Sequence, residues 1–363
     1  MEKFAFIIHP IDVRRDVSRK GGIYRAAAHL PESWVENLIK LKKPIVISHI
    51  TGVKSLTGVE AEGWFIACPL TPRQLITLPD DFVVERLVQC GELAAAEGAK
   101  IIGLGAFTSV AGDGGVTVAK NLKNIAVTTG NSYTVATAVE AAVDAAGRMG
   151  IALSQSKVAI VGATGAIGRT CAHLLASDVR EIALIGRDLG KLDRVADEIG
   201  TGNTSVYDSV RAGLRDALVV ITVTSAVDSV IQPEDLTSGA VVCDVARPRD
   251  VSVRVSKERK DVLVIEGGVI SVPGANVDFN FNFGFEPKTA YACMSETMML
   301  ALEGRYENFT LGKDVSVQQV REIVPLAKKH GFKLAGYRSF EKPVTAETIE
   351  RARSSARERD LVS

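Results

Sequence analysis

The 363-residue sequence lacks several features that would each indicate a different class of protein. Its five cysteines form no CxxC pair, and its five histidines show no metal-ligand spacing. This argues against a disulfide framework or a metal site and predicts a reducing, cytoplasmic location. No run approaches the length of about 20 apolar residues that a transmembrane helix needs, so no membrane span is expected. The N-terminus, MEKFAFIIHP, predicts a first strand rather than a signal peptide.

The charge balance excludes partners that bind through bulk charge. Formal net charge at pH 7 is zero, which favours neither nucleic acid nor a membrane surface. The composition, 46% hydrophobic and 24% charged, is that of an ordinary globular protein long enough for two domains. Nothing in the composition indicates an oligomeric state.

A glycine turn in the middle of the chain organises the rest. Lys157–Val161 is β-branched and apolar, as a strand buried on both faces should be, and Ile182–Ile185 predicts a second strand. A helix that begins with Thr170–Leu175 is predicted between them. This βαβ pattern with glycines three residues apart is typical of a dinucleotide site, although a glycine turn without cofactor is the alternative. The predicted cofactor-binding residues of the turn are Gly162, Ala163, Thr164, Gly165, Ala166, Ile167 and Gly168.

The residues after the second strand favour NADP(H). Arg187 can pair with a 2′-phosphate, and Lys191 follows shortly after. Asp188 keeps NAD(H) open, because an acidic residue near this position binds the ribose hydroxyls in NAD sites. The alternative is that Arg187 and Lys191 are simply the solvated start of a helix.

Alternating strands and helices predict an α/β protein with two domains. We expect a substrate α/β domain over 1–150, a doubly wound Rossmann domain over 151–286, and C-terminal helices over 287–363 that return to the first domain. In the first domain, the predicted strands are Phe4–Ile8, Pro44–His49, Trp64–Cys68 and Lys100–Leu104, and the predicted helices are Glu32–Leu41, Phe82–Glu97 and Tyr133–Met149. Further on, we expect strands at Ala217–Val223, Ala240–Asp244 and Val262–Ile265, helices at Leu192–Ile199, from Pro287 to Gly304 and at Val317–Lys329, and a partly frayed charged tail from Ser354.

Candidate site residues follow the predicted strands, because ligands bind at the carboxyl edge of a parallel sheet. Those near ribose and nicotinamide are Thr224, Ser225, Asp244, Gly267 and Gly268. In the first domain, the glycine-rich stretch 103–115 is expected to be a ligand loop, or else a plain flexible turn. Asn131 or Ser132 is expected to cap the following helix, whose start suits an anion or a polarised oxygen.

Cys293 is a candidate nucleophile in the second turn of the helix expected from Pro287, sharing a face with Glu296. A cysteine chosen without other information is more often a small buried residue. Among the others, Cys243 ends a strand and could approach the nicotinamide, whereas Cys171 looks structural.

Colinear matches give the chain a family resemblance. It resembles the long-chain acyl-[acyl-carrier-protein] reductases of cyanobacteria and their bacterial relatives over most of its length. The matching stretches are 15–19, 105–109 (family GGFTS), 128–131 (TTGN), 162–168 (GATGDIG), 266–269 (NGGVV) and 291–296 (FACFAE). The stretch 243–250, CDVARPRD, is closer to the shikimate dehydrogenase and glutamyl-tRNA reductase type of Rossmann domain.

The resemblance implies a two-stage reaction. Cys293 would take the acyl group from an acyl carrier protein or coenzyme A, and NADPH would reduce the enzyme thioester to an aldehyde. Hypothetical donors to the oxyanion or contacts to the substrate are Thr108, Ser109, Thr128, Thr129, Asn131, Gly267 and Gly268. No histidine is obviously placed to activate Cys293. Two alternatives stay open: a dehydrogenase of a small hydroxy or amino acid without a covalent intermediate, and a nucleotide-binding regulatory protein without turnover.

Overall fold

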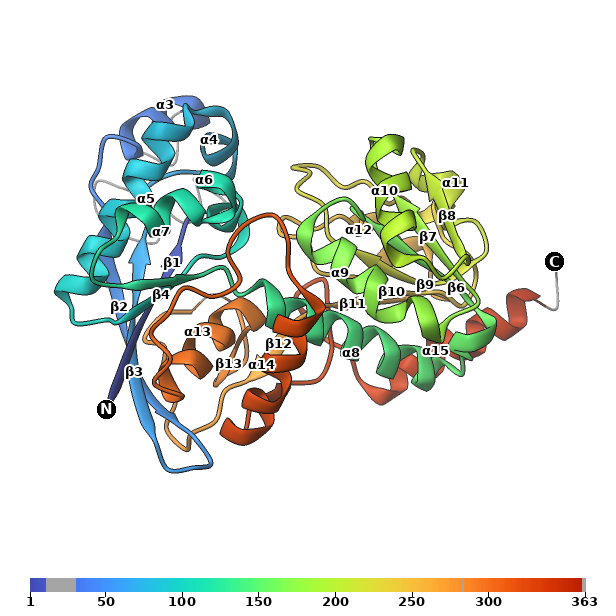
Figure 1. Ribbon diagram of the computed structural model, residues 1–363. Helices are drawn as coiled ribbons and strands as arrows, with labels where there is room; N and C mark the ends of the chain where they lie inside the picture. Colours follow the sequence, from blue (N-terminus) through green and yellow to red (C-terminus); the bar gives the residue numbers. More distant parts are fainter. Residues whose placement is uncertain (11–30, 283, 361–363) are drawn as a thin grey trace.

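The computed structural model describes residues 1–10, 31–282 and 284–360, and in Figure 1 two lobes lie side by side with a long helix running between them. The family match at 15–19 lies outside the described residues. Of the helices that the structure describes, none combines the length and apolar character that a membrane crossing requires.

The N-terminal lobe is built on a five-stranded sheet in the order β2-β3-β1-β4-β5. Only β2 runs antiparallel to its neighbour. Along β1, Phe4 and Phe6 pack into the core that contains helix α13 (Ala292–Leu302). Ala5 and Ile7 pack into the core on the other face, which contains helix α5 (Asp80–Ala96). The sheet is thus buried on both faces, as continuous apolar strands require. Its elements are β1 (Glu2–Ile8), α3 (Glu32–Ile39), β2 (Ile45–Lys54), β3 (Glu60–Ala67), α4 (Pro72–Thr77), α5 (Asp80–Ala96), β4 (Ile101–Gly103), η1 (Ala106–Ser109), α6 (Ala111–Gly114), α7 (Val116–Asn121) and β5 (Ala126–Thr128).

The second lobe is a Rossmann domain. Its six strands are all parallel and have the order β11-β10-β9-β6-β7-β8. From β6 the strand order runs outward first to one edge and then, from β9, to the other edge, so the topological switch point lies between β6 and β9. The predicted fold class is confirmed, and the helix after the glycine turn begins earlier than expected, at Ala166. The elements are β6 (Lys157–Val161), α9 (Ala166–Leu175), β7 (Glu181–Ile185), α10 (Leu189–Ile199), β8 (Thr204–Tyr207), α11 (Val210–Leu214), β9 (Ala217–Thr222), β10 (Val241–Asp244), α12 (Val253–Glu258) and β11 (Leu263–Glu266).

Helix α8 (Asn131–Met149) joins the lobes and packs against elements of both, including α13, α9 and β10. Its buried positions are mostly alanines, such as Ala138, Ala142 and Ala145, which allow close approach on several sides. The prediction of a side-chain cap by Asn131 or Ser132 was wrong. The cap residue is Gly130, with φ of +74°, and no side chain caps the helix from that position.

The C-terminal region corrects two further predictions. Residues Thr289–Tyr291 form β13, which pairs with β12 (Val269–Ser271), so α13 (Ala292–Leu302) begins at Ala292 and not near Pro287. Strand β14 (Lys333–Leu334) completes this small sheet after α14 (Val317–His330).

The charged tail is a helix and does not fray from Ser354. Helix α15 (Ala346–Asp360) follows the hairpin of β15 (Arg338–Ser339) and β16 (Lys342–Pro343) and lies along α8 beneath the Rossmann lobe in Figure 1. Ile349, Ala352 and Ala356 form its buried stripe. Helices α13 and α14 therefore return to the first lobe and its linking helix, whereas α15 belongs with the second.

Candidate active site

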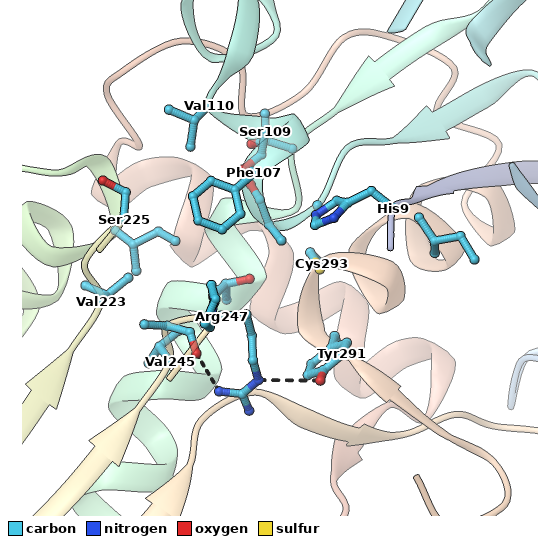
Figure 2. A pocket seen from close by; sticks show the side chains of 18 of the residues that line it. His9, Phe107, Ser109, Val110, Val223, Ser225, Val245, Arg247, Tyr291 and Cys293 are labelled. Carbon is cyan, nitrogen blue, oxygen red and sulfur yellow. Dashed lines mark hydrogen bonds between the residues drawn. The ribbon is translucent and has the colours of Figure 1, made fainter. Parts of the chain in front are cut away.

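One pocket of about 1910 Å³ lies between the lobes, where the carboxyl ends of the parallel strands of both sheets face each other. Its size exceeds that of a typical site for a single small molecule, which is about 300–1,000 Å³. Figure 2 shows side chains from both lobes converging on it. Predicted site residues that line the pocket are Ser109, Thr129, Asn131, Gly162, Thr164, Gly165, Ala166, Ile167, Arg187, Thr224, Ser225, Gly267, Gly268 and Cys293.

The glycine turn has the geometry that a dinucleotide needs. Gly162 has φ of +88°, and a Cβ there would lie 2.7 Å from the Val223 oxygen. A Cβ at Gly168 would lie 2.4 Å from the Gly162 oxygen, so this glycine lets α9 pack against the turn. At Gly165 the nearest atom would be 3.4 Å away, and this open position faces the pocket at the start of α9. These are the three roles of the glycines in a pyrophosphate site, and the residues present fit the cofactor.

The charged residues after β7, Arg187, Asp188 and Lys191, have different surroundings. Arg187 is exposed and lines the pocket. The Asp188 carboxylate instead caps α10, accepting a hydrogen bond from the Lys191 N–H at 3.0 Å, and lies 3.5 Å from Lys191 Nζ. Lys191 does not line the pocket. Arg187 is therefore the member of this group that faces the cofactor position.

Asp244, predicted as a neighbour of the cofactor, does not line the pocket. Its carboxylate turns away from the pocket and accepts hydrogen bonds from the N–H groups of Ala246 and Val251, each at 3.1 Å. Burial raises its pKa to about 6. Thr224 lines the pocket, but its N–H and hydroxyl donate to Asp250. These carboxylates hold the loops at the strand ends in place.

Cys293 is the second residue of α13, not a second-turn residue as predicted. Tyr291 precedes the helix, and the Ala292 N–H donates to the Gly268 oxygen at 2.8 Å, which fixes the helix start at the cofactor side of the pocket. The first turn of a helix carries partial positive charge and unpaired N–H groups, and both favour a thiolate.

Three glycines of the first lobe make room for this helix. A Cβ at Gly130 would lie 2.3 Å from Cys293 Cα, and one at Gly105 would lie 3.4 Å from the Cys293 sulfur. A Cβ at Gly103 would lie 2.2 Å from Thr297 Oγ1, one turn along the helix. The glycine-rich stretch that was predicted as a loop, 103–115, contains η1 and α6, and its first part lies against the candidate nucleophile.

The surroundings of the Cys293 thiol act on its charge in opposite directions. Burial raises its pKa to about 12, and the nearby Glu296 carboxylate adds to the increase. The Met294 N–H and the Arg247 guanidinium lower it. A thiolate is the reactive form, so these groups favour reaction, together with the N–H of Cys293 itself, which also lowers the thiol pKa.

Glu296 is fully buried and ties the site together. Its carboxylate accepts hydrogen bonds from the hydroxyls of Thr128 and Ser132, each at 2.6 Å, and from the Tyr133 N–H at 2.9 Å. The Thr310 hydroxyl donates at 3.1 Å. The predicted anion at the start of α8 is thus a side chain of the protein itself.

Several hypothetical oxyanion donors are engaged elsewhere. The hydroxyls of Thr108 and Thr129 donate to the backbone oxygens of Gly105 and Thr310, and the Thr128 hydroxyl to Glu296. The Gly267 N–H donates to the Asp244 oxygen at 3.0 Å. Thr108, Thr128, Ala163 and Gly168 do not line the pocket.

His9 and Arg247 are two of the pocket residues that the sequence reasoning missed. His9 follows β1, and its ring lies edge-on to Phe107 with centroids 6.3 Å apart, on the Cys293 side of the pocket in Figure 2. Arg247 lies in the loop after β10 and also lines the pocket. Both follow parallel strands, so the rule that located Thr224 would also have found them.

The other four cysteines are buried. Cys243, the alternative neighbour of the nicotinamide, has no exposed surface, and its Sγ lies 3.7 Å from the Ala138 oxygen of α8. Among the residues that the structure describes, no group of three potential metal ligands occurs.

A family model for shikimate / quinate 5-dehydrogenase matches residues 144–266, which is the Rossmann domain with the end of α8. Together with the strand order and the glycine turn, this match defines the chain as an NAD(P)-dependent oxidoreductase with a domain that binds NADP(H). The match ends before Cys293, so it bears on the cofactor and not on the substrate.

Two curated relatives are similar along nearly the whole chain. One is the aminotransferase PigE of Serratia sp., 30% identical over 91% of this chain, which itself spans only 39% of that protein. Another is the long-chain acyl-[acyl-carrier-protein] reductase of Synechococcus elongatus, 27% identical over 89% of this chain and 95% of the relative. Among solved structures, the L-tryptophan dehydrogenase of Nostoc punctiforme is 12% identical, covering 99% of this chain and 89% of its own, with a TM-score of 0.41.

Proposed function

We propose that the protein is an NADPH-dependent reductase that converts an acyl thioester to an aldehyde through an acyl group bound to Cys293. The observation that carries the proposal is the position of Cys293: a partly exposed thiol at a helix start, in the pocket that also receives the glycine turn. Similarity to a long-chain acyl-[acyl-carrier-protein] reductase over 95% of that relative supports the same chemistry.

The pocket also has an apolar region that suits an acyl chain. It extends from Cys293 into the first lobe, along the end of β1 and the side of α3. Its apolar lining includes Phe6, Ile8, Val35, Leu38, Ile47 and Phe107. Burial of a CH₂ group contributes about 0.8 kcal/mol, so an apolar wall of this kind favours long acyl chains over short ones.

The chemistry assigned to the protein's own residues is a transfer and a release. The Cys293 thiolate forms a bond to the carbonyl carbon, and the bond to the carrier sulfur breaks, which frees the carrier thiol. NADPH, when bound, supplies the hydride for reduction. The Cys293 sulfur then leaves as the thiolate, which is a better leaving group than an alkoxide. The glycine turn and Arg187 would hold the pyrophosphate and the 2′-phosphate.

The test is covalent trapping without cofactor. Purified protein is incubated with a long-chain acyl-coenzyme A or acyl carrier protein and no NADPH, and its intact mass is measured. We expect one acyl adduct on the wild type, none on Cys293→Ala, and discharge to aldehyde when NADPH is added. Cys68→Ala is the matched control, because Cys68 also borders the pocket but is buried at the end of β3.

Each other outcome would count against the proposal. An adduct on Cys293→Ala, or NADPH oxidation that Cys293→Ala leaves unchanged, excludes the covalent route and favours a dehydrogenase without an acyl intermediate. Nucleotide binding without turnover of either thioester favours the regulatory alternative.

A further inference from the structure

Three arginines line the pocket beside Cys293 and converge on one buried carboxylate. We call Arg247, Arg249 and Arg338 the arginine cluster. Their guanidinium nitrogens lie 3.2, 3.7 and 3.9 Å from the oxygens of Glu266. A second carboxylate, Glu341, is exposed and lies 3.0 Å from Arg249. Glu266 and Glu341 thus pair with the cluster, and the Asp244 carboxylate attracts Arg247 as well.

Arg247 is the member of the cluster that reaches the start of α13. Its Nε donates to the Tyr291 hydroxyl at 3.4 Å, and its guanidinium lies 5.5 Å from the centroid of the Tyr291 ring. Tyr291 is the residue before α13, two positions from Cys293. Figure 2 shows Arg247, Tyr291 and Cys293 around the same part of the pocket.

The hydrogen bonds of Arg247 fix the position of its guanidinium and leave one guanidinium N–H without an acceptor among the described residues. Besides the Tyr291 bond, Nη1 donates to the oxygens of Ala246 at 2.7 Å and Asp244 at 3.3 Å, and Nη2 donates to Glu266 at 3.2 Å. Four of the five guanidinium N–H groups are thus used within the described residues. A side chain held by so many bonds needs little reorganisation when a charge appears beside it.

We propose that Arg247 is the electrostatic partner of Cys293, which stabilises first the thiolate and then the oxyanion of the acyl group bound to it. The candidate donors Thr128, Thr129 and Gly267 are engaged in other hydrogen bonds, whereas Arg247 keeps one N–H and a permanent charge. The oxyanion role rests on the proposed function, but the thiolate role does not.

The other titratable groups around Cys293 also act on the pKa of its thiol, and the positive charge of Arg247 acts against those that raise it. Within α13 itself, Glu296 places a buried carboxylate one turn from the thiol and disfavours the thiolate. From the end of β1, His9 borders the pocket. From the loop after β10, Arg247 is the permanent cation, and it lowers the pKa of the thiol. Removal of Arg247 would leave the effect of Glu296 without this opposing charge.

The test measures the thiol and needs no substrate. The rate of alkylation by iodoacetamide is followed against pH in the full-length protein, and Cys293→Ala supplies the background from the four buried cysteines. For Arg247→Gln we expect the apparent thiol pKa to rise by about one unit, so that alkylation at neutral pH slows about tenfold. Arg247→Lys should restore most of the rate, because it restores the charge. Tyr291→Phe removes the hydrogen bond but keeps the charge, and it should change the rate less than threefold.

Arg249→Gln is the matched control, because Arg249 shares Glu266 and the same loop but makes no contact with Tyr291. An unchanged thiol pKa in Arg247→Gln, or an equal rise in Arg249→Gln, would overturn the proposal. So would a rise that Arg247→Lys fails to reverse. Circular dichroism and NADPH affinity identify a variant that has lost its fold. Failure of the acyl adduct to form, with the thiol pKa still dependent on Arg247, would reject the proposed function and leave this inference standing.

Discussion

The two lobes use glycine in two different ways, and the difference explains what a sequence reveals. In the Rossmann lobe, Gly162 and Gly168 contact each other across one turn of chain. In the first lobe, Gly130 makes room for Cys293, which comes from a helix that follows much later in the sequence. Glycines that serve a local turn form a motif, whereas glycines that serve a distant helix look like ordinary loop residues.

Substitution of a first-lobe glycine is the strongest test of the difference between the two lobes. Gly130→Ala would place a Cβ 2.3 Å from Cys293 Cα at a backbone with φ of +74°. We expect the start of α13 to shift, unfolding free energy to fall by about 2 kcal/mol, and acyl transfer to Cys293 to slow about a hundredfold. NADPH affinity should stay within threefold of the wild type, and its loss would show that the two lobes do not act separately.

The Rossmann glycines provide the converse test. Gly168→Ala would force a Cβ to within 2.4 Å of the Gly162 oxygen and push α9 from the turn. NADPH affinity should fall about 10- to 100-fold, as expected for overpacking that costs about 1–3 kcal/mol. Acylation of Cys293 in the absence of NADPH should be unaffected. Titration by tryptophan fluorescence and intact mass measure the two effects in one preparation.

Substitution of Arg187 tests whether the second lobe prefers NADPH over NADH. Arg187→Ala removes the exposed guanidinium after β7 and should weaken NADPH binding about tenfold while NADH binding changes little. Lys191→Ala is the control, because Lys191 lies outside the pocket lining. Equal losses of the two cofactors in Arg187→Ala would contradict the assignment of the 2′-phosphate.

The smallest effect concerns the contact of α15 with the Rossmann lobe. Burial opposes the charge of Asp261, but Arg259, at 2.8 Å, and Arg359 of α15, at 3.0 Å, lower its pKa to about 2. Because the folded-state pKa lies below the ordinary value, this stability is present above about pH 4 and is lost as pH falls toward 2. Arg359→Ala should cost less than about 1 kcal/mol, since Arg359 is half exposed.

Denaturant unfolding over this pH range measures the contribution of Asp261. Asp261→Asn should flatten the pH dependence between about pH 4 and 2, and a slope identical to the wild type would show that other carboxylates are responsible.

Elements set by interactions between residues close in sequence were predictable, whereas elements set by contacts with distant segments were not. The glycine turn and its two flanking strands were predictable, because strand, turn and helix lie within one short stretch, whereas β8 was not predicted. The start of α13 was not, because Thr289–Tyr291 becomes a strand only through pairing with Val269–Ser271. Ser132 has the chemistry of a helix cap, yet its hydroxyl serves Glu296 from another helix.

The C-terminal helix was missed for a different reason. Its sequence is rich in charge, and the small residues Ala352 and Ala356 make its buried stripe inconspicuous. Helical spacing from Ile349 was present in the sequence and would have indicated a packed face.

The position of α13 along the chain also has a consequence for biosynthesis. Helix α13 covers the face of the first-lobe sheet that carries Phe4 and Phe6, and it brings Cys293, although it is made after both sheets. On a ribosome, the strands of both large sheets are therefore synthesised before the thiol exists, and one face of the first sheet stays uncovered until α13 is made. Of the groups that border the thiol, His9 and Arg247 are synthesised before Cys293, whereas Glu296 is synthesised after it.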